Sequence, residues 1–248
     1  MVAARTERAL ADFTLAQRAF AVAAWPMRAA EELRSALVFR AIRTAARQIG
    51  DAPCRRWDRV FSRLVGDELR HARLCAETGV LLGAPRPQYD VGVLRARLQT
   101  LTDTRSRLLS LLLIEVAIGE TLSTAFFSAG KQLAREPHTR RVLATILRDE
   151  VRHARLGWRA VAELGQGATA MLATEARKGL LGLERDLAIP ALRRLEAGEP
   201  FDPALAELGV LPPEVRVETF YKTIETSIVP RLDALGLDGT LAWRDRWK

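Results

Sequence analysis

Cysteine is scarce in this chain of 248 residues, and its two copies, Cys54 and Cys75, do not form a Cys-X-X-Cys pair. The sequence therefore offers no disulfide scaffold and no thiolate site for zinc or redox chemistry. Runs of alternating β-branched residues are also absent, which argues against half-buried strands. The apolar content of 48% is ample for a sizeable core.

A long apolar run without charges is missing too. The longest candidate, residues 108–127, is interrupted by Glu115 and Glu120, so it does not provide the roughly 18 uncharged residues that a membrane span needs. The beginning of the chain carries too many charges for the apolar centre of a signal peptide. We therefore expect a cytoplasmic protein without a membrane partner.

Aromatic residues are few, at 6%, and they do not interleave with a basic stripe. The net charge of +8 comes mainly from arginines scattered over the whole chain. A groove for nucleic acid would combine clustered basic residues with stacking aromatic ones. The sequence therefore favours a solvated, arginine-rich surface over a nucleic-acid site.

Helical periodicity runs through almost every segment and predicts an all-α fold. Pro26 suits the first turn of a helix, so a separate N-terminal helix should end near Ala24. Proline, glycine and capping residues then predict four longer helices at residues 26–48, 53–78, 103–133 and 137–165. Only the middle connection is long, at roughly 15 to 20 residues. This layout is typical of two antiparallel helix hairpins joined by a crossover, which is a four-helix bundle.

The rest of the chain predicts a helical extension of that bundle. One helix should be broken or bent at Pro190, because proline cannot continue the ladder of hydrogen bonds. The final helix carries Phe220, Ile224 and Ile228 on one face, so we expect it to pack on the bundle. The predicted units are a bundle and a C-terminal extension, at residues 1–165 and 166–248.

One eight-residue segment occurs twice in the sequence. Asp67–Leu74 reappears as Asp149–Leu156 with seven of eight residues identical. Each copy has a histidine three residues after a glutamate, and these are two of the chain's three histidines. On a helix, side chains at i and i+3 lie on one face about one turn apart, so both can reach the same cation. The repeat therefore predicts two metal-binding pairs, Glu68 with His71 and Glu150 with His153.

A site for two metal ions needs one more glutamate from each of the other two helices. The first helix offers Glu31 or Glu32, and the third offers Glu115 or Glu120 inside an apolar stretch. A buried unpaired carboxylate is costly, and a bound cation removes that cost. Four glutamates balance two divalent ions. Oxygen-rich ligation with one imidazole per ion favours iron, with manganese or a mixed pair as alternatives.

Asp67 and Asp149 precede the ligand glutamates and lie off the face that carries them. Each can accept a hydrogen bond from the metal-bound imidazole of the opposite hairpin, or pair with Arg70 or Arg152. The third histidine, His138, is expected at the surface or in a helix cap.

These motifs resemble those of the ferritin-like superfamily, which includes ferritins, rubrerythrins and several di-iron oxygenases. More narrowly, the chain is similar to bacterial ferritin-like domain proteins with Glu-X-X-Ser in the first helix, Glu-X-X-X-Gly-Glu-Thr in the third and Trp-Arg after the second histidine motif. Here these elements are Glu32–Ser35, Glu115–Thr121 and Trp158–Arg159. The resemblance covers about residues 25–159. It implies a two-metal bundle and selects Glu32 as the ligand of the first helix.

The third helix leaves two candidates open. Residue counts back from the turn prolines slightly favour Glu115 as the constant ligand, with Glu120 as a neighbour that shifts with oxidation state. Both stay in the predicted set. The candidate metal ligands are Glu32, Glu68, His71, Glu115, Glu120, Glu150 and His153.

The leading functional hypothesis is an oxidoreductase in which two iron ions activate O₂ to oxidise a small organic substrate, with electrons from a separate donor. Glu68 and Glu150 would bridge the ions, and the other ligands would be terminal. The alternative is a ferroxidase or iron-handling protein, and a tRNA-hydroxylating di-iron enzyme ranks after it. A homodimer is compatible with the sequence.

Overall fold

A computed structural model describes residues 13–90 and 103–248, and both ranges are helical with no strand. The all-α prediction is therefore confirmed for these residues. The first part of the chain forms α2 (Leu15–Ile49), α3 (Ala52–Leu81), α5 (Thr104–Leu111), the π-helical segment η1 (Leu112–Gly119), α6 (Glu120–Leu133) and α7 (Pro137–Leu164). These elements make a helical bundle.

Helices α2 and α3 form a hairpin because the chain between them has strong stop and start signals. Gly50 adopts a φ of 70° at the end of α2, a conformation that favours glycine. Asp51 then caps α3 by accepting a hydrogen bond from the backbone N–H of Cys54, and Pro53 occupies the first turn. Two residues therefore reverse the chain.

Helix α2 continues through Pro26, so the separate N-terminal helix predicted from the sequence is wrong. A proline inside a helix removes one hydrogen bond and costs about 3 kcal/mol. Trp25 beside it is fully buried, and its indole Nε1 donates to the carbonyl oxygen of Leu208 at 3.0 Å. Pro26 also packs closely on α3, where a Cβ on Gly79 would lie 3.2 Å from its Cδ. These tertiary contacts hold the helix together across the proline.

Helices α5, η1 and α6 form one helical stretch that packs on α7. The wider turns of η1 bring its backbone close to α7. A Cβ on Gly157 of α7 would lie only 2.8 Å from the backbone nitrogen of Ala117, so this close approach requires glycine. The stretch Thr104–Leu133 is long and apolar enough to cross a membrane, but 61% of its most apolar window is buried inside the protein. It is placed as the core helix of the bundle.

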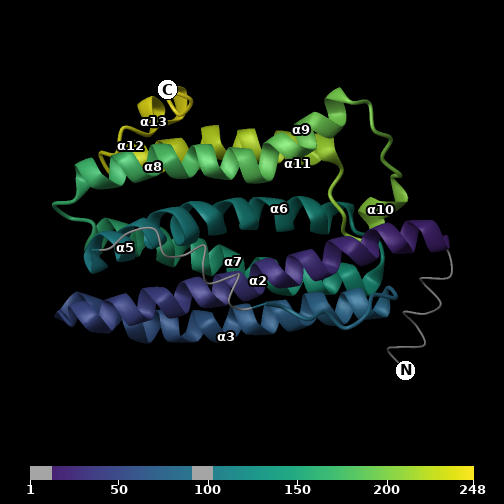
Figure 1. Cartoon of the computed structure of the whole chain (residues 1–248), viewed down its shortest axis with the longest axis horizontal. Coiled ribbons are helices and arrows are strands. Elements are labelled where there is room, and N and C mark those ends of the chain that lie inside the picture. The colour runs from purple at the N-terminus through teal and green to yellow at the C-terminus, as the bar shows by residue number, and fades with distance from the viewer. Residues whose placement is uncertain (1–12, 91–102) are drawn as a thin grey trace.

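The C-terminal part forms a further helical layer beyond α6 (Figure 1). Phe220, Ile224 and Ile228 are fully buried there, in the same core as Leu112 and Leu113 of η1. The layer consists of α8 (Thr169–Leu183), η2 (Glu184–Ala188), α9 (Ile189–Glu196), α11 (Pro213–Thr223), η3 (Ile224–Ile228), α12 (Val229–Ala234) and α13 (Gly239–Arg244). The short helix α10 (Ala204–Glu207) lies outside this layer and contacts α2 and α6.

Both long helices of this layer contain a proline next to a π-helical segment. η2 ends two residues before Pro190, and η3 ends two residues before Pro230. Proline has no N–H to donate, and a π turn is one way in which a helix absorbs the missing bond. The helix therefore continues through Pro190 instead of breaking there.

Candidate metal centre

Six acidic and imidazole side chains from four different helical elements meet in the centre of the bundle. They form two groups, and in each group the potential ligand atoms all lie within 4.8 Å of one another. None of the six residues is more than 6% exposed. The groups are Glu32, Glu68, His71 and Glu150, and Glu68, Glu120, Glu150 and His153.

The donor atoms of the cluster are spaced as the ligands of a metal ion can be. Glu68 Oε1, Glu150 Oε1 and the Nδ1 atoms of His71 and His153 are buried and lack a hydrogen-bond partner within the described part of the chain. Yet His153 Nδ1 lies 2.8 Å from Glu68 Oε1, and His71 Nδ1 lies 3.2 Å from Glu150 Oε1. Two ligand atoms bound at right angles to one cation, each about 2.1 Å away, lie about 3 Å apart. The spacing of the four atoms is therefore compatible with ligands of a metal ion.

Each imidazole is held by an aspartate of the other motif copy. His71 Nε2 lies 3.2 Å from Asp149 Oδ2, and His153 Nε2 lies 3.3 Å from Asp67 Oδ2. When Nε2–H donates to the aspartate, the lone pair of Nδ1 faces the cluster. The hydrogen bond from each imidazole to the opposite hairpin, predicted from the repeat, is present in the structure.

Two arginines complete this crossed arrangement on the outer side. Arg70 contacts Asp149 at 2.7 Å and Asp67 at 2.8 Å, while Arg152 contacts Asp67 at 2.5 Å and Asp149 at 3.4 Å. Burial acts against ionisation, but hydrogen bonds from histidine and arginine keep the pKa of both aspartates below its usual value. The aspartates therefore serve both roles that the sequence left open.

Without metal, the cluster retains protons because its carboxylates are buried close together. Burial raises the pKa of Glu68 and of Glu150 to about 7. Burial alone would lower the pKa of the imidazoles, but Glu150 holds the pKa of His71 far above its ordinary value, and Asp67 raises that of His153 to about 9. Protons therefore supply the positive charge that divalent cations can replace.

Glu115 lies outside the cluster, which favours Glu120 as the ligand, whereas residue counting slightly favoured Glu115. The Glu115 carboxylate accepts two hydrogen bonds from Arg34, at 2.9 and 2.7 Å, and its side chain is 25% exposed. Glu120 is 4% exposed and belongs to the second group. Counting assumed regular α-helical turns, but Glu115 lies within η1, which has more residues per turn.

The remaining sequence candidates lie away from the cluster. Glu31 belongs to neither group. His138 is half-buried at the start of α7, and its Nε2 lies 3.1 Å from the Thr78 hydroxyl. Sequence reasoning missed Phe39, a fully buried ring that packs edge-on against His153 with 5.9 Å between ring centroids. Nothing in the pattern of α2 distinguishes Phe39 from its other core residues.

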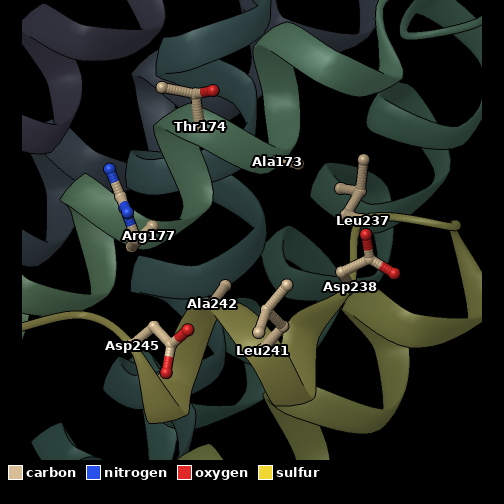
Figure 2. Close-up of a pocket in the computed structure, with 8 residues that line it drawn as sticks. All are labelled: Ala173, Thr174, Arg177, Leu237, Asp238, Leu241, Ala242 and Asp245. Carbon is tan, nitrogen blue, oxygen red and sulfur yellow. The ribbon is translucent and has the colours of Figure 1, made fainter. Parts of the chain in front are cut away.

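A surface pocket between α8 and α13 is separate from this cluster (Figure 2). Leu237, Leu241 and Ala242 form its apolar side, and Arg177 and Asp245 lie at its rim. It shares no residue with the cluster, and its lining contains no histidine or cysteine.

Comparisons of the chain with protein-family models, with curated proteins and with solved structures found no match. The assignment of a function therefore depends on the geometry of the cluster.

Proposed function

We propose that this chain is a ferritin-like di-iron oxidoreductase that uses O₂ to oxidise a small organic substrate. The observation that carries the proposal is the set of four buried donor atoms without hydrogen-bond partners, two from carboxylates and two from imidazoles. Leaving such atoms unpaired costs about 1–3 kcal/mol each. Bound cations would offset that cost and so explain why these polar atoms are buried together.

The donor set favours two ions of the iron or manganese type. Each group offers three carboxylates and one imidazole, and Glu68 and Glu150 belong to both groups. This sharing supports their proposed role as bridges, with one terminal glutamate and one histidine for each ion. Ligation rich in oxygen with a single nitrogen suits Fe(II) or Mn(II) better than structural zinc. Bound iron would supply the chemistry of O₂ reduction.

The protein's own residues would position these ligands and keep water out. Asp67 and Asp149 orient the two imidazoles, and Phe39 walls the cluster beside His153. The layer of helices beyond α6 covers the outer face of α6. A ferroxidase would need the same ligands, so iron stoichiometry separates it from an oxidase.

Anaerobic titration with Fe(II) tests the proposed site. We expect uptake of about two Fe(II) per chain, with no further loading in air, as in a di-iron carboxylate bundle. The double variant Glu68→Ala/Glu150→Ala should bind almost none, because it removes both shared carboxylates. Glu115→Ala is the matched control and should bind as the wild type does. Equal iron content in the double variant and the wild type would rule out the site, and loading far above two ions per chain would indicate iron storage.

A further inference from the structure

The outer surfaces of α3 and α7 are strongly basic. These two helices contain twelve arginines and no lysine, against three acidic residues outside the buried motifs, Asp58, Glu77 and Glu163. Each of the three is already paired with an arginine. The rest of the chain is nearly balanced, with 26 basic and 23 acidic residues left of the 38 and 30 in total. We call this surface the arginine face.

Several arginines on this face have no counter-ion in the protein. Among the residues that the structure describes, Arg59, Arg63, Arg155 and Arg159 have no carboxylate within 4.0 Å. Unpaired positive charge on one side of a protein creates a field that attracts an acidic partner and speeds its association. Arginine is also enriched at the interfaces of protein complexes. The face is therefore suited to an anionic macromolecule.

The arginine face lies directly over the candidate metal centre. Arg70 and Arg152 have 39% and 52% of their side chains exposed, and both hydrogen-bond to the aspartates that hold the imidazoles. A single aspartate therefore separates each of these arginines from a histidine of the cluster. α3 also lies on the side of the bundle away from the C-terminal layer (Figure 1). This is a short route from solvent to the buried site.

We propose that the arginine face docks an acidic one-electron carrier protein, which supplies electrons to the metal centre. This inference rests on the proposed function. Returning two ferric ions to the ferrous state takes two electrons. The carrier delivers one electron in each of two encounters and is itself oxidised each time. The four electrons that bring both atoms of one O₂ to the oxidation level of water then come in equal parts from the carrier and the organic substrate, and solvent supplies the two protons that accompany the carrier's electrons.

A protein partner fits this surface better than a nucleic acid. The large apolar side chains exposed on α3 are aliphatic, such as Leu69 and Val80. Trp57 of α3 is 4% exposed, and the indole of Trp158 of α7 is engaged by the Thr121 hydroxyl. Binding to unpaired bases relies on exposed aromatic rings for stacking. A surface rich in arginine, without exposed aromatic rings on α3, matches a protein interface instead.

The test uses a plant-type [2Fe–2S] ferredoxin, a small acidic one-electron carrier, as the probe. Its affinity for the metal-free full chain is measured by calorimetry at low salt, together with two double variants. Arg59→Glu/Arg155→Glu reverses two unpaired charges on the arginine face. Arg177→Glu/Arg193→Glu makes the same charge change on the C-terminal layer and serves as the control. Circular dichroism checks that both variants fold.

The arginine-face variant should bind ferredoxin at least about ten-fold more weakly than the wild type, and the control should stay within about two-fold. Affinity should also fall steeply as salt is added. Ferredoxin should also reduce the iron-loaded arginine-face variant more slowly than the iron-loaded wild type, by the same factor as the affinity falls. Dithionite should reduce the arginine-face variant and the control variant at equal rates. Equal weakening by the two variants, or no binding to the wild type, would overturn the proposal. So would tighter binding of transfer RNA than of ferredoxin to the arginine face.

Binding to the metal-free chain reports on the face alone, whereas iron uptake and dithionite-supported O₂ consumption report on the proposed function.

Discussion

Two glutamates five residues apart on one helical stretch, Glu115 and Glu120, end in different surroundings. The first pairs with Arg34 near the surface, and the second is buried among the carboxylates of the cluster. Burial and the nearby Glu150 raise the pKa of Glu120 well above its ordinary value. Such a carboxyl is stabilised by a cation beside it. Arg34 already neutralises Glu115, so that residue has less need of a metal ion.

This difference gives a prediction at the scale of single residues. Glu120→Ala should lower the iron content from about two ions per chain to about one, because each ion in such bundles draws on one terminal glutamate. Glu115→Ala should keep both ions. Elemental analysis after anaerobic loading measures both. Loss of iron in the Glu115 variant alone would restore the order expected from residue counting.

At the scale of elements, η1 packs closely against two neighbouring helices just before Glu120. α7 approaches this segment at Gly157 and α8 approaches it at Gly179, where a Cβ would overlap the side chain of Ile114. The contact at Gly157 is with backbone atoms, which cannot move aside by rotating a side chain. The packing of α7 therefore fixes the position of η1 and, through it, the start of α6.

Gly157→Ala should lower the free energy of unfolding by about 2 kcal/mol, because overpacking forces the backbone to shift. It should also weaken iron binding, since η1 must move away from α7. Gly182→Ala is the matched control. A Cβ there meets no atom of the described chain within 4 Å, so this helical position should gain up to about 1 kcal/mol. Urea denaturation of both variants measures the difference, and equal stability of the two would contradict the proposed role of this contact.

At the scale of the whole molecule, the C-terminal layer and the bundle share one core. Hydrogen bonds to Glu184, which is 2% exposed, connect the last residues of the chain to this layer. The Glu184 carboxylate accepts hydrogen bonds from Tyr221 at 2.9 Å, from Arg246 at 2.6 and 2.8 Å and from Trp247 at 3.0 Å. A buried carboxylate that is fully paired in this way holds α13 in place.

The metal-free protein should lose stability as the pH rises from about 5 to about 9. In the folded state the pKa of Glu68 and of Glu150 is about 7, above the ordinary 4.5, and that of His153 is about 9, above 6.5. A group whose pKa is raised by folding stabilises the fold below its unfolded pKa, and this contribution is lost as the pH rises through the folded pKa. As the pH rises, the cluster therefore gains negative charge on Glu68 and Glu150 and loses the positive charge of His153.

Mn(II) should reverse this loss, because it binds the native state and replaces the protons. The difference in Tm between metal-loaded and metal-free protein should therefore be larger at pH 8.5 than at pH 6. Differential scanning calorimetry measures it, and Glu68→Ala/Glu150→Ala should show no difference at either pH. A gap of the same size at both pH values would contradict the proton-for-metal exchange.

Sequence alone determined the features that depend on local geometry. The all-α fold follows from periodicity, and each Glu–His pair follows from the i and i+3 positions of a helix, which place both side chains on one face whatever surrounds them. The hairpin turn at Gly50–Pro53 could be predicted for the same reason, since capping residues are local. The residues of the first helix left Glu31 and Glu32 open, and only the resemblance to ferritin-like proteins favoured Glu32.

Only the tertiary structure decided the features that depend on packing between elements. The π-helical turns of η1 cannot be read from residue counts, so the choice of Glu120 over Glu115 required the fold. The continuity of α2 through Pro26 depends on the burial of Trp25 against Leu208. The concentration of charge on the arginine face appears only when α3 and α7 lie side by side. In each case the deciding contacts join residues far apart in the sequence.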